Sequence, residues 1–353
     1  MLKKGNMMKK KSLIAGGCSL AGLLLMIVAF IAARGNLAEL STRNVQAVQK
    51  EYECSTDIIK IDADITSDNL EIRTGDVEYI SVSYYDRPGY NEYEITESGD
   101  SLGIRYVDLH PIEVLTIDLD FEDKPVIITV PESFSGKVNI SSSSGSIIAE
   151  SINVSSLDLK NTSGGIRIND VDTATDVKLS STSGSINVDS LVCKNLTASN
   201  TSGGISIENS DIYELLDTKC SSGDISIKSV SVKEGARLST SSGTRYLEDV
   251  SAQYLECDGS SGSLKAVDVT VLNSFSSSTT SGSVTLDRVE TGNSIKISAS
   301  SGDVRGTIVG NKDDFNISVN TSSGSSNLSD SSDGNKKLTI STTSGSIDID
   351  FTE

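Results

Sequence analysis

The amino-acid sequence predicts an all-β protein, a β-solenoid (β-helix) built from coils of about 20 residues, with an N-terminal transmembrane helix. Three observations support this prediction. A Ser-Gly pair recurs at nearly constant spacing, aliphatic residues alternate at fixed distances from that pair, and one long apolar run stands near the N-terminus.

The apolar run covers residues 13–33 and contains no charged side chain. A helix of this length spans about 30 Å, the thickness of a bilayer core. The residues before it include five lysines, Lys3, Lys4, Lys9, Lys10 and Lys11. The positive-inside rule therefore predicts a single-pass protein of the cell membrane, with a cytoplasmic tail at 1–12 and the C-terminal domain extracellular.

Cys18 lies inside this run and follows Ala15-Gly16-Gly17, which faintly resembles a lipoprotein cleavage box. The apolar run continues for fifteen residues beyond Cys18, whereas a lipoprotein turns polar there. We expect a small residue within a spanning helix, and keep lipidation of Cys18 as the alternative.

The segment 34–53 has no proline and only Gly35, and from residue 36 it reads as a polar stalk or linker, helical in the simplest interpretation. From residue 58 onward the sequence alternates between apolar and polar residues in short runs, such as KIDADI and VIITVP. Alternation of this kind is typical of strands with one buried face. We interpret 54–135 as an irregular β cap with the first coils.

The regular repeat occupies 136–353, and eleven glycines mark it at steps of 19 to 22 residues. These are Gly145, Gly164, Gly184, Gly203, Gly223, Gly243, Gly262, Gly282, Gly302, Gly324 and Gly345. Aliphatic residues stand seven and five positions before most of these glycines and two, four and seven positions after them. The pattern predicts eleven stacked coils, each with two short strands joined by a turn. The glycine is expected at a corner that needs a positive φ.

Two inward positions break the pattern, because Arg245 and Ser326 stand where other coils have aliphatic residues. Local distortion is expected at both. The longer steps near the C-terminus predict loops around Asn311–Asp314 and Ser329–Lys336. The last coil, which ends at Glu353, should leave an open edge, along which outward Asp348 and Asp350 discourage edge-to-edge pairing.

Acidic residues five or six positions after the glycines are the candidate binding site. The candidates are Glu150, Asp170, Asp189, Glu208, Asp249, Asp268 and Asp287. Stacking would align several of them, and Ca²⁺ would relieve their repulsion. Solvated turns explain the same residues, because Asp is common at turns. No other metal, cofactor or catalytic residue is predicted.

Four cysteines outside the apolar run, Cys54, Cys193, Cys220 and Cys257, occupy different phases of the repeat and are expected to be buried free thiols. Tyr84, Tyr85, Tyr90 and Tyr93 form either a binding patch or, as we expect, packing within the cap. Some β-helices are polysaccharide-acting enzymes, but with one histidine and 5% aromatic residues the sequence gives this interpretation little support.

The SSGSIxI-type coils after a stretch ending in VIITVPES resemble the bacterial putative adhesin family, a β-solenoid domain of unknown function, over about residues 54–353. The resemblance implies a non-catalytic envelope protein and brings no catalytic residues. We therefore expect an adhesin-like scaffold that binds cell-wall polymer or a surface protein. The alternative is an envelope-stress sensor acting with a membrane partner. The net charge of −19 excludes nucleic acid as a partner.

Overall fold

The computed structural model describes residues 46–109 and 124–353, which fall into two compact units. The larger unit comprises Lys50–Tyr84, Tyr93–Tyr106 and Lys124–Glu353, and it holds the solenoid. The smaller unit contributes residues 46–49, 85–92 and 107–109, including a tight turn in which Gly89 has a φ of +82°. The predicted tail, apolar run, Cys18 and first part of the stalk lie outside the described residues. Within the described residues, no helix is long and apolar enough to cross a membrane.

The described residues before the regular repeat form seven strands, several of which match the alternating runs of the sequence. They are β1 (Val48–Glu53), β2 (Lys60–Ile65), β3 (Leu70–Thr74), β4 (Ser81–Asp86), β5 (Asn91–Ser98), β6 (Ser101–Asp108) and β7 (Val126–Val130). The helical interpretation of the stalk is wrong for β1. This segment pairs with β4, and the sheet satisfies backbone groups that a short isolated helix would hold only marginally.

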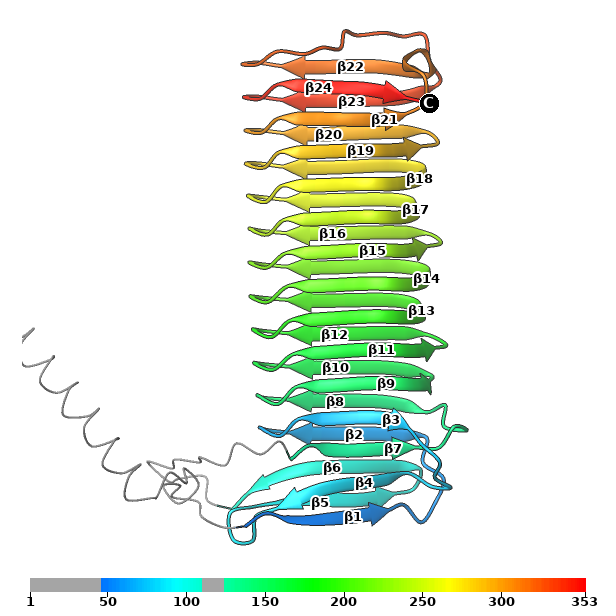
Figure 1. Ribbon diagram of the computed structural model, residues 1–353, viewed down its shortest axis with the longest axis vertical. Coiled ribbons are helices and arrows are strands. Elements are labelled where there is room, and N and C mark those ends of the chain that lie inside the picture. The colour runs from blue at the N-terminus through cyan, green and yellow to red at the C-terminus, as the bar shows by residue number, and fades with distance from the viewer. Residues whose placement is uncertain (1–45, 110–123) are drawn as a thin grey trace, which may run out of the picture. The chain divides into compact units, whose positions relative to one another are not determined.

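The repeat region consists of strands that pair in parallel between successive coils, as Figure 1 shows. The strands are β8 (Lys137–Ser142), β9 (Ile147–Val154), β10 (Ser156–Asn161), β11 (Ile166–Thr173), β12 (Asp176–Ser181), β13 (Ile186–Asn200), β14 (Ile205–Cys220), β15 (Ile225–Val232), β16 (Gly235–Thr240), β17 (Arg245–Gly259), β18 (Leu264–Thr279), β19 (Val284–Thr291), β20 (Ser294–Ala299), β21 (Val304–Val309), β22 (Phe315–Thr321), β23 (Lys336–Thr342) and β24 (Ile347–Thr352). The coil that contains β22 has no complete second strand, so about ten of the eleven expected coils are full turns.

The register is one full coil, so equivalent positions stack in columns. Leu157 pairs with Val177 and Ile166 pairs with Ile186, for example. The aliphatic columns predicted from the sequence are buried almost completely and form one continuous core. The solenoid prediction is confirmed for the described residues.

The glycine column is confirmed in position but not in its conformational reason. None of the eleven glycines has a positive φ. Each turn instead passes so close to the next that a side chain would overlap the neighbouring backbone; a Cβ on Gly184 would collide with the carbonyl group of Gly164. Close approach between coils, and not a left-handed corner, therefore requires glycine here.

The left-handed residues lie six positions after the glycine, inside the strand that follows each Ser-Gly turn. They are Ser151, Asp170, Ser190, Asn209, Ser229, Asp249, Asp268 and Arg288, with φ between +49° and +57°. Short polar side chains tolerate this conformation best, because they can hydrogen-bond locally. The chain bends here so that residues on both sides of the bend can point inward.

A buried polar column lies three positions before the glycines, and its side chains close several of the turns from inside. Thr240 Oγ1 donates to the carbonyl oxygen of Gly243 at 2.8 Å, and Ser142 Oγ donates to that of Gly145 at 2.9 Å. Asn200 is more elaborate, since its Nδ2 donates to the Gly184 carbonyl while its Oδ1 accepts from the backbone of Gly203. These bonds satisfy turn groups that would otherwise be buried without a partner.

Arg245 is fully buried, but the expected distortion around it is absent. Its strand stays in register with Ile225 on one side and Leu264 on the other. Distortion does occur at Ser326, which makes only an isolated bridge to Ile347 before the chain turns away. The expected loops are present, and the first of them contains the 3₁₀ turn η2 (Lys312–Asp314).

The order of coils in space differs from their order in sequence at both ends (Figure 1). Near the cap, β2 lies between β6 and β8, and β3 lies between β7 and β9. At the other end, β23 lies between β20 and β22. β23 is therefore paired on both sides, so this half of the terminal coil does not form the open edge that the sequence suggested, whereas β24 pairs with β21 and meets Ser326 only through an isolated bridge.

The edge is β22 instead, and a returning segment covers part of it. Ile317 and Ser331 exchange two backbone hydrogen bonds of 2.8 and 2.9 Å, and the Asp330 carboxylate accepts from the Val319 N–H. Asp348 and Asp350 are exposed, as predicted. Covering and charge together discourage addition of a further strand.

Candidate functional site

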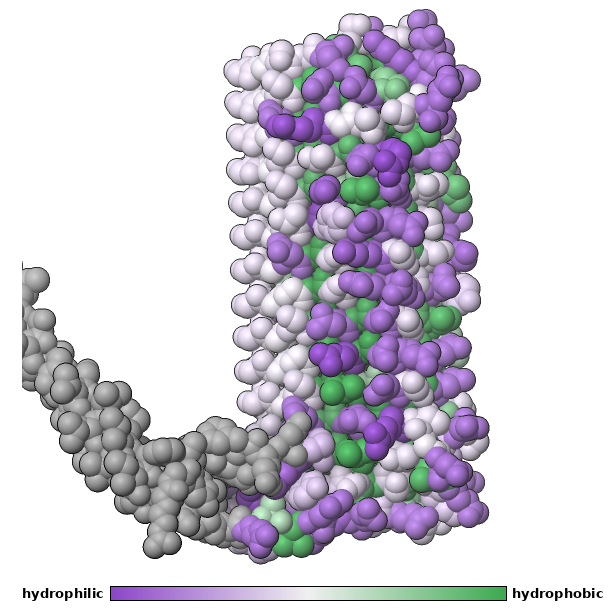
Figure 2. Space-filling view, in the orientation of Figure 1, coloured by the Kyte–Doolittle hydropathy of each residue, from purple (hydrophilic) through white to green (hydrophobic). Residues whose placement is uncertain are grey.

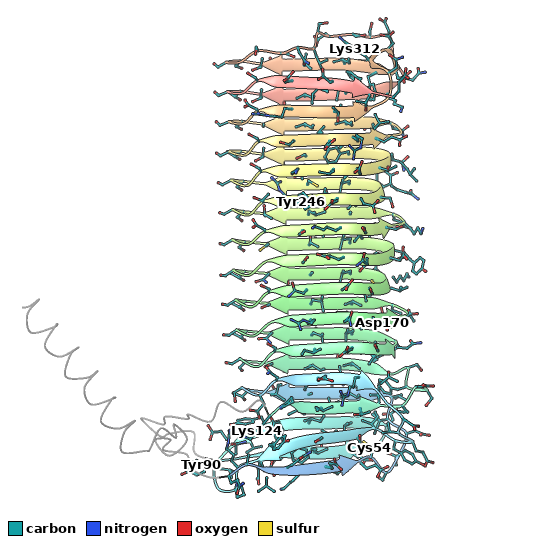
Figure 3. All side chains as sticks on the ribbon, viewed as in Figure 1. Cys54, Tyr90, Lys124, Asp170, Tyr246 and Lys312 are labelled. Carbon is teal, nitrogen blue, oxygen red and sulfur yellow. The ribbon has the colours of Figure 1, made fainter. Side chains whose placement is uncertain are left out.

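The predicted acidic residues fall into two neighbouring columns near the bend of the coil. Glu150, Asp189, Glu208 and Asp287 lie five positions after their glycines, whereas Asp170, Asp249 and Asp268 lie six positions after and are left-handed. Figure 3 places Asp170 at the end of its coil opposite the Ser-Gly turns. The second group thus has a backbone reason to be Asp, independent of any ligand.

Several of the acids already have partners from an adjacent coil. Asp170 accepts a hydrogen bond from Ser151 Oγ at 3.1 Å, and Asp189 accepts one from Asn209 Nδ2 at 2.8 Å. Arg288 Nε lies 2.6 Å from Asp268 Oδ1, and this hydrogen bond raises the pKa of Arg288. The protein's own groups therefore relieve part of the repulsion for which Ca²⁺ was the suggested remedy.

The first column is not a continuous run of acids. Asn169 stands between Glu150 and Asp189, and Lys228 follows Glu208. Over residues 46–109 and 124–353, no three His, Cys, Asp or Glu side chains come together as a metal site. Calcium prefers six to eight oxygens, which two stacked carboxylates do not supply by themselves. Calcium binding here stays a prediction from the sequence.

A shallow groove of about 460 Å³ runs across the outer face of β9, β11, β13 and β14. Its lining includes Glu71, Ile148, Glu150, Arg167, Asn169, Asn187, Asp189, Ser206 and Glu208. We call this feature the acidic groove. Its carboxylates and amides can accept hydrogen bonds from hydroxyl or ammonium groups, and Arg167 can donate them.

The four cysteines are buried and free, as predicted. Burial raises the pKa of Cys193 and of Cys257 to about 12, and that of Cys54 to about 11. A thiol with such a pKa is protonated at neutral pH and is a poor nucleophile. Cys54, Cys193 and Cys257 are therefore thiols that serve packing of the core.

Two of the four predicted tyrosines pack inside the cap. Tyr93 contacts Tyr84 and Tyr106 edge-to-face, with ring centroids 5.6 and 5.7 Å apart. The Tyr93 hydroxyl also donates to Asp68 at 2.7 Å. Cap packing is thus confirmed for Tyr84 and Tyr93, while Tyr85 and Tyr90 are partly exposed.

The outer surface is not uniform, as Figure 2 shows. A pale stripe follows the Ser-Gly turns along one edge, and hydrophilic and hydrophobic residues mix on the face beside it. Sequence reasoning missed one apolar group on this outer surface, made of Tyr213, Leu215, Tyr254 and Leu272, each more than half exposed. The signal was present, since Leu215 and Tyr254 stand eight positions before a glycine, where Ser156, Asp176 and Asn195 are polar.

The sequence of the solenoid matches one known family model. The family model described as Toastrack DUF4097 matches residues 58–215 and 210–353, which together cover most of the chain. The chain belongs to the Toastrack DUF4097 family. Among curated proteins, none matches this member of the family.

Solved structures similar to this Toastrack DUF4097 protein include three from Parabacteroides and Bacteroides species. A putative adhesin from Parabacteroides merdae is 12% identical, with 74% of this chain and 96% of that chain covered and a TM-score of 0.43. A putative lipid binding protein from Parabacteroides distasonis is 16% identical, with 87% and 98% covered and a TM-score of 0.43. A putative adhesin from Bacteroides fragilis is 12% identical, with 86% and 97% covered and a TM-score of 0.33.

Proposed function

We propose that this Toastrack DUF4097 protein is a non-catalytic, membrane-anchored surface protein whose solenoid binds a cell-envelope component or another surface protein. One observation supports this proposal above the others. The coils stack in register, so outward side chains form straight columns in which equivalent residues repeat at about 4.8 Å. Such a surface suits recognition of an extended or repetitive partner.

The chemistry of the described residues favours binding over catalysis. The thiols are protonated and buried, and the buried Arg245 is committed to backbone carbonyl groups. The candidate acids lie in open columns and shallow grooves, where water screens their charges. Fold alone never assigns an activity, and these side chains do not assemble one.

The membrane anchor rests on the sequence. The uncharged run at 13–33 is long enough to span a bilayer, and the lysines before it favour a cytoplasmic N-terminus. Under this proposal the described residues face the outside of the cell. The net charge of −19 favours neutral or basic partners over anionic ones.

A binding experiment with cell-wall and surface fractions tests the proposal. The purified full chain is expected to be retained on at least one such fraction, in calcium or in chelator. A matched variant with Glu150→Gln, Asp189→Asn and Glu208→Gln neutralises the acidic groove without changing side-chain size much. Binding to no fraction would overturn the proposal. Recovery of a single integral membrane protein, with no wall polymer, would favour envelope-stress sensing instead.

A further inference from the structure

The exposed apolar residues of the solenoid concentrate at one corner. Tyr213, Leu215, Tyr254 and Leu272 have 53%, 53%, 54% and 64% of their surface exposed and come from β14, β17 and β18, with β16 lying between β14 and β17. Single exposed apolar residues need no explanation, but a group on adjacent coils marks an interaction site. Water contact with this group has a free-energy cost that a ligand would remove.

The register creates a gap within the group. Leu215 pairs with Gly235, and Gly235 pairs with Tyr254, so the glycine separates the two large side chains along one outward column. Two strand spacings, about 10 Å, separate the aliphatic side chain from the phenol ring. A Cβ on Gly235 would lie 3.3 Å from Leu215 Cδ2. The Leu215 side chain thus reaches toward the bare backbone of Gly235, and Leu215, Gly235 and Tyr254 together line a slot with apolar walls.

This slot opens into a hollow of about 650 Å³, which we call the Tyr254 hollow. Its polar lining comprises Asp217, Glu234, Arg237, Gln253 and Glu256. Arg237 Nε donates to Glu256 at 2.7 Å, an ion pair that fixes both groups at one side. The Glu234 carbonyl oxygen accepts from the backbone N–H groups of Gln253 and Tyr254, at 2.9 and 3.0 Å, which fixes the opposite side.

We propose that the Tyr254 hollow binds one or two rings of a neutral glycan, with a pyranose lying over Gly235 against the Tyr254 ring. The apolar face of a sugar ring fits the walls of the slot, and its hydroxyl groups fit carboxylate, amide and guanidinium partners. The inference rests on the proposed function, because it names the ligand class of a binding scaffold.

The surroundings favour a sugar over other occupants. An extended peptide would need unpaired backbone groups, but β14, β16 and β17 are paired to each other through this region. A polyanion would meet the carboxylates of Asp217, Glu234 and Glu256. A neutral polyhydroxylated ligand meets neither obstacle.

Calorimetry and tyrosine fluorescence with neutral oligosaccharides test the proposal on the full chain. The probes are cellohexaose and N-acetylglucosamine tetramer, with oligogalacturonate as the anionic control. The chain has no tryptophan, so its emission reports tyrosine. Tyr254→Ala should weaken binding on the order of tenfold, the size of one lost aromatic contact. Tyr254→Phe should retain binding, and Gly235→Val should abolish it by filling the slot.

Tyr246→Ala is the matched control, since Tyr246 lies on another face, between Lys228 and Lys265. Native binding by Gly235→Val and Tyr254→Ala would overturn the assignment. So would binding to an envelope fraction without binding to either neutral probe, although the proposed function would then survive. Loss of all envelope binding by the native chain would instead remove the proposed function itself.

Discussion

The guanidinium group of Arg245 fills the space that Gly259 leaves empty at the other end of the same strand, β17. Gly259 stands between Thr240 and Thr279 in the buried polar column, where the neighbouring coils carry hydroxyl groups. Arg245 Nη2 donates to the Gly262 carbonyl oxygen at 2.6 Å and Nη1 donates to that of Cys257 at 3.2 Å. Arginine thus supplies the donor that the missing side chain would have supplied.

A double-mutant cycle on Arg245 and Gly259 can measure how strongly the two positions depend on each other. Gly259→Thr should cost about 1–3 kcal/mol, because a Cβ there would lie 2.5 Å from Arg245 Cζ. Arg245→Leu should cost a similar amount, because it leaves a void and removes the guanidinium donors to the Gly262 and Cys257 carbonyl groups. The double variant has Leu and Thr at these two positions, as the next coil has at Leu264 and Thr279, so it should be more stable than either single variant. Urea unfolding of all four proteins gives the coupling energy, and strictly additive effects would contradict the pairing.

The glycine column gives a second prediction, for which a glycine of the preceding coil outside the column is the control. Gly184→Ala should destabilise the solenoid by about 2–4 kcal/mol, because the new methyl group would overlap the Gly164 backbone and separate two coils. Gly165→Ala is the matched change, since the nearest atom to its Cβ, the Ser185 carbonyl oxygen, is 3.4 Å away. Thermal unfolding followed by circular dichroism compares them. Equal loss in the two variants would show that close approach is not the reason for glycine.

The sequence was sufficient for the repeat and its core, and its failures have physical causes. The position of Gly184 was predictable from spacing, but its reason depends on the distance between coils, which no single coil encodes. Arg245 suggested distortion because its complement, Gly259, is fourteen residues away and looks unremarkable. The sequence did not reveal that β23 lies between β20 and β22, because all coils carry the same apolar pattern and this pattern does not specify their order in space. In the site, Asp268 was visible as an acid, but its contact with Arg288 required the register.

The column of residues with positive φ includes Ser229, whose φ is +51°. This backbone conformation predicts that stability depends on which side chain replaces Ser229. Ser229→Val should destabilise by about 1–3 kcal/mol, because a β-branched side chain is strained in this conformation. Ser229→Asn should be close to neutral, as Asn209 occupies the equivalent place one coil earlier. Ser231→Val, at an outward position of the same strand, controls for the polarity change. Denaturant midpoints separate the variants, and tolerance of Val at Ser229 would argue against the left-handed bend.

The Glu97 carboxylate predicts how the cap responds to pH. It accepts hydrogen bonds from the Tyr52 hydroxyl at 2.7 Å, from the Ser55 backbone N–H at 3.0 Å and from the Thr56 hydroxyl at 2.9 Å. These bonds, led by that from Tyr52, lower the pKa of Glu97 from 4.5 to about 2, and the same bond raises the pKa of Tyr52 from 10.0 to about 12.

The two shifts act at opposite ends of the pH scale. The Glu97 carboxylate stabilises the folded state above pH 4.5. This stabilisation is lost as the pH falls toward 2, because the carboxylate then becomes protonated in the folded state as well. The Tyr52 contribution is present below pH 10 and is lost as the pH rises toward 12. Hydrogen exchange of the Ser55 amide and ultraviolet titration of Tyr52 measure the two limbs. Glu97→Gln should flatten the acid limb and lower the Tyr52 pKa toward 10, whereas an unchanged Tyr52 titration would show that the hydrogen bond does not hold β1 to the cap.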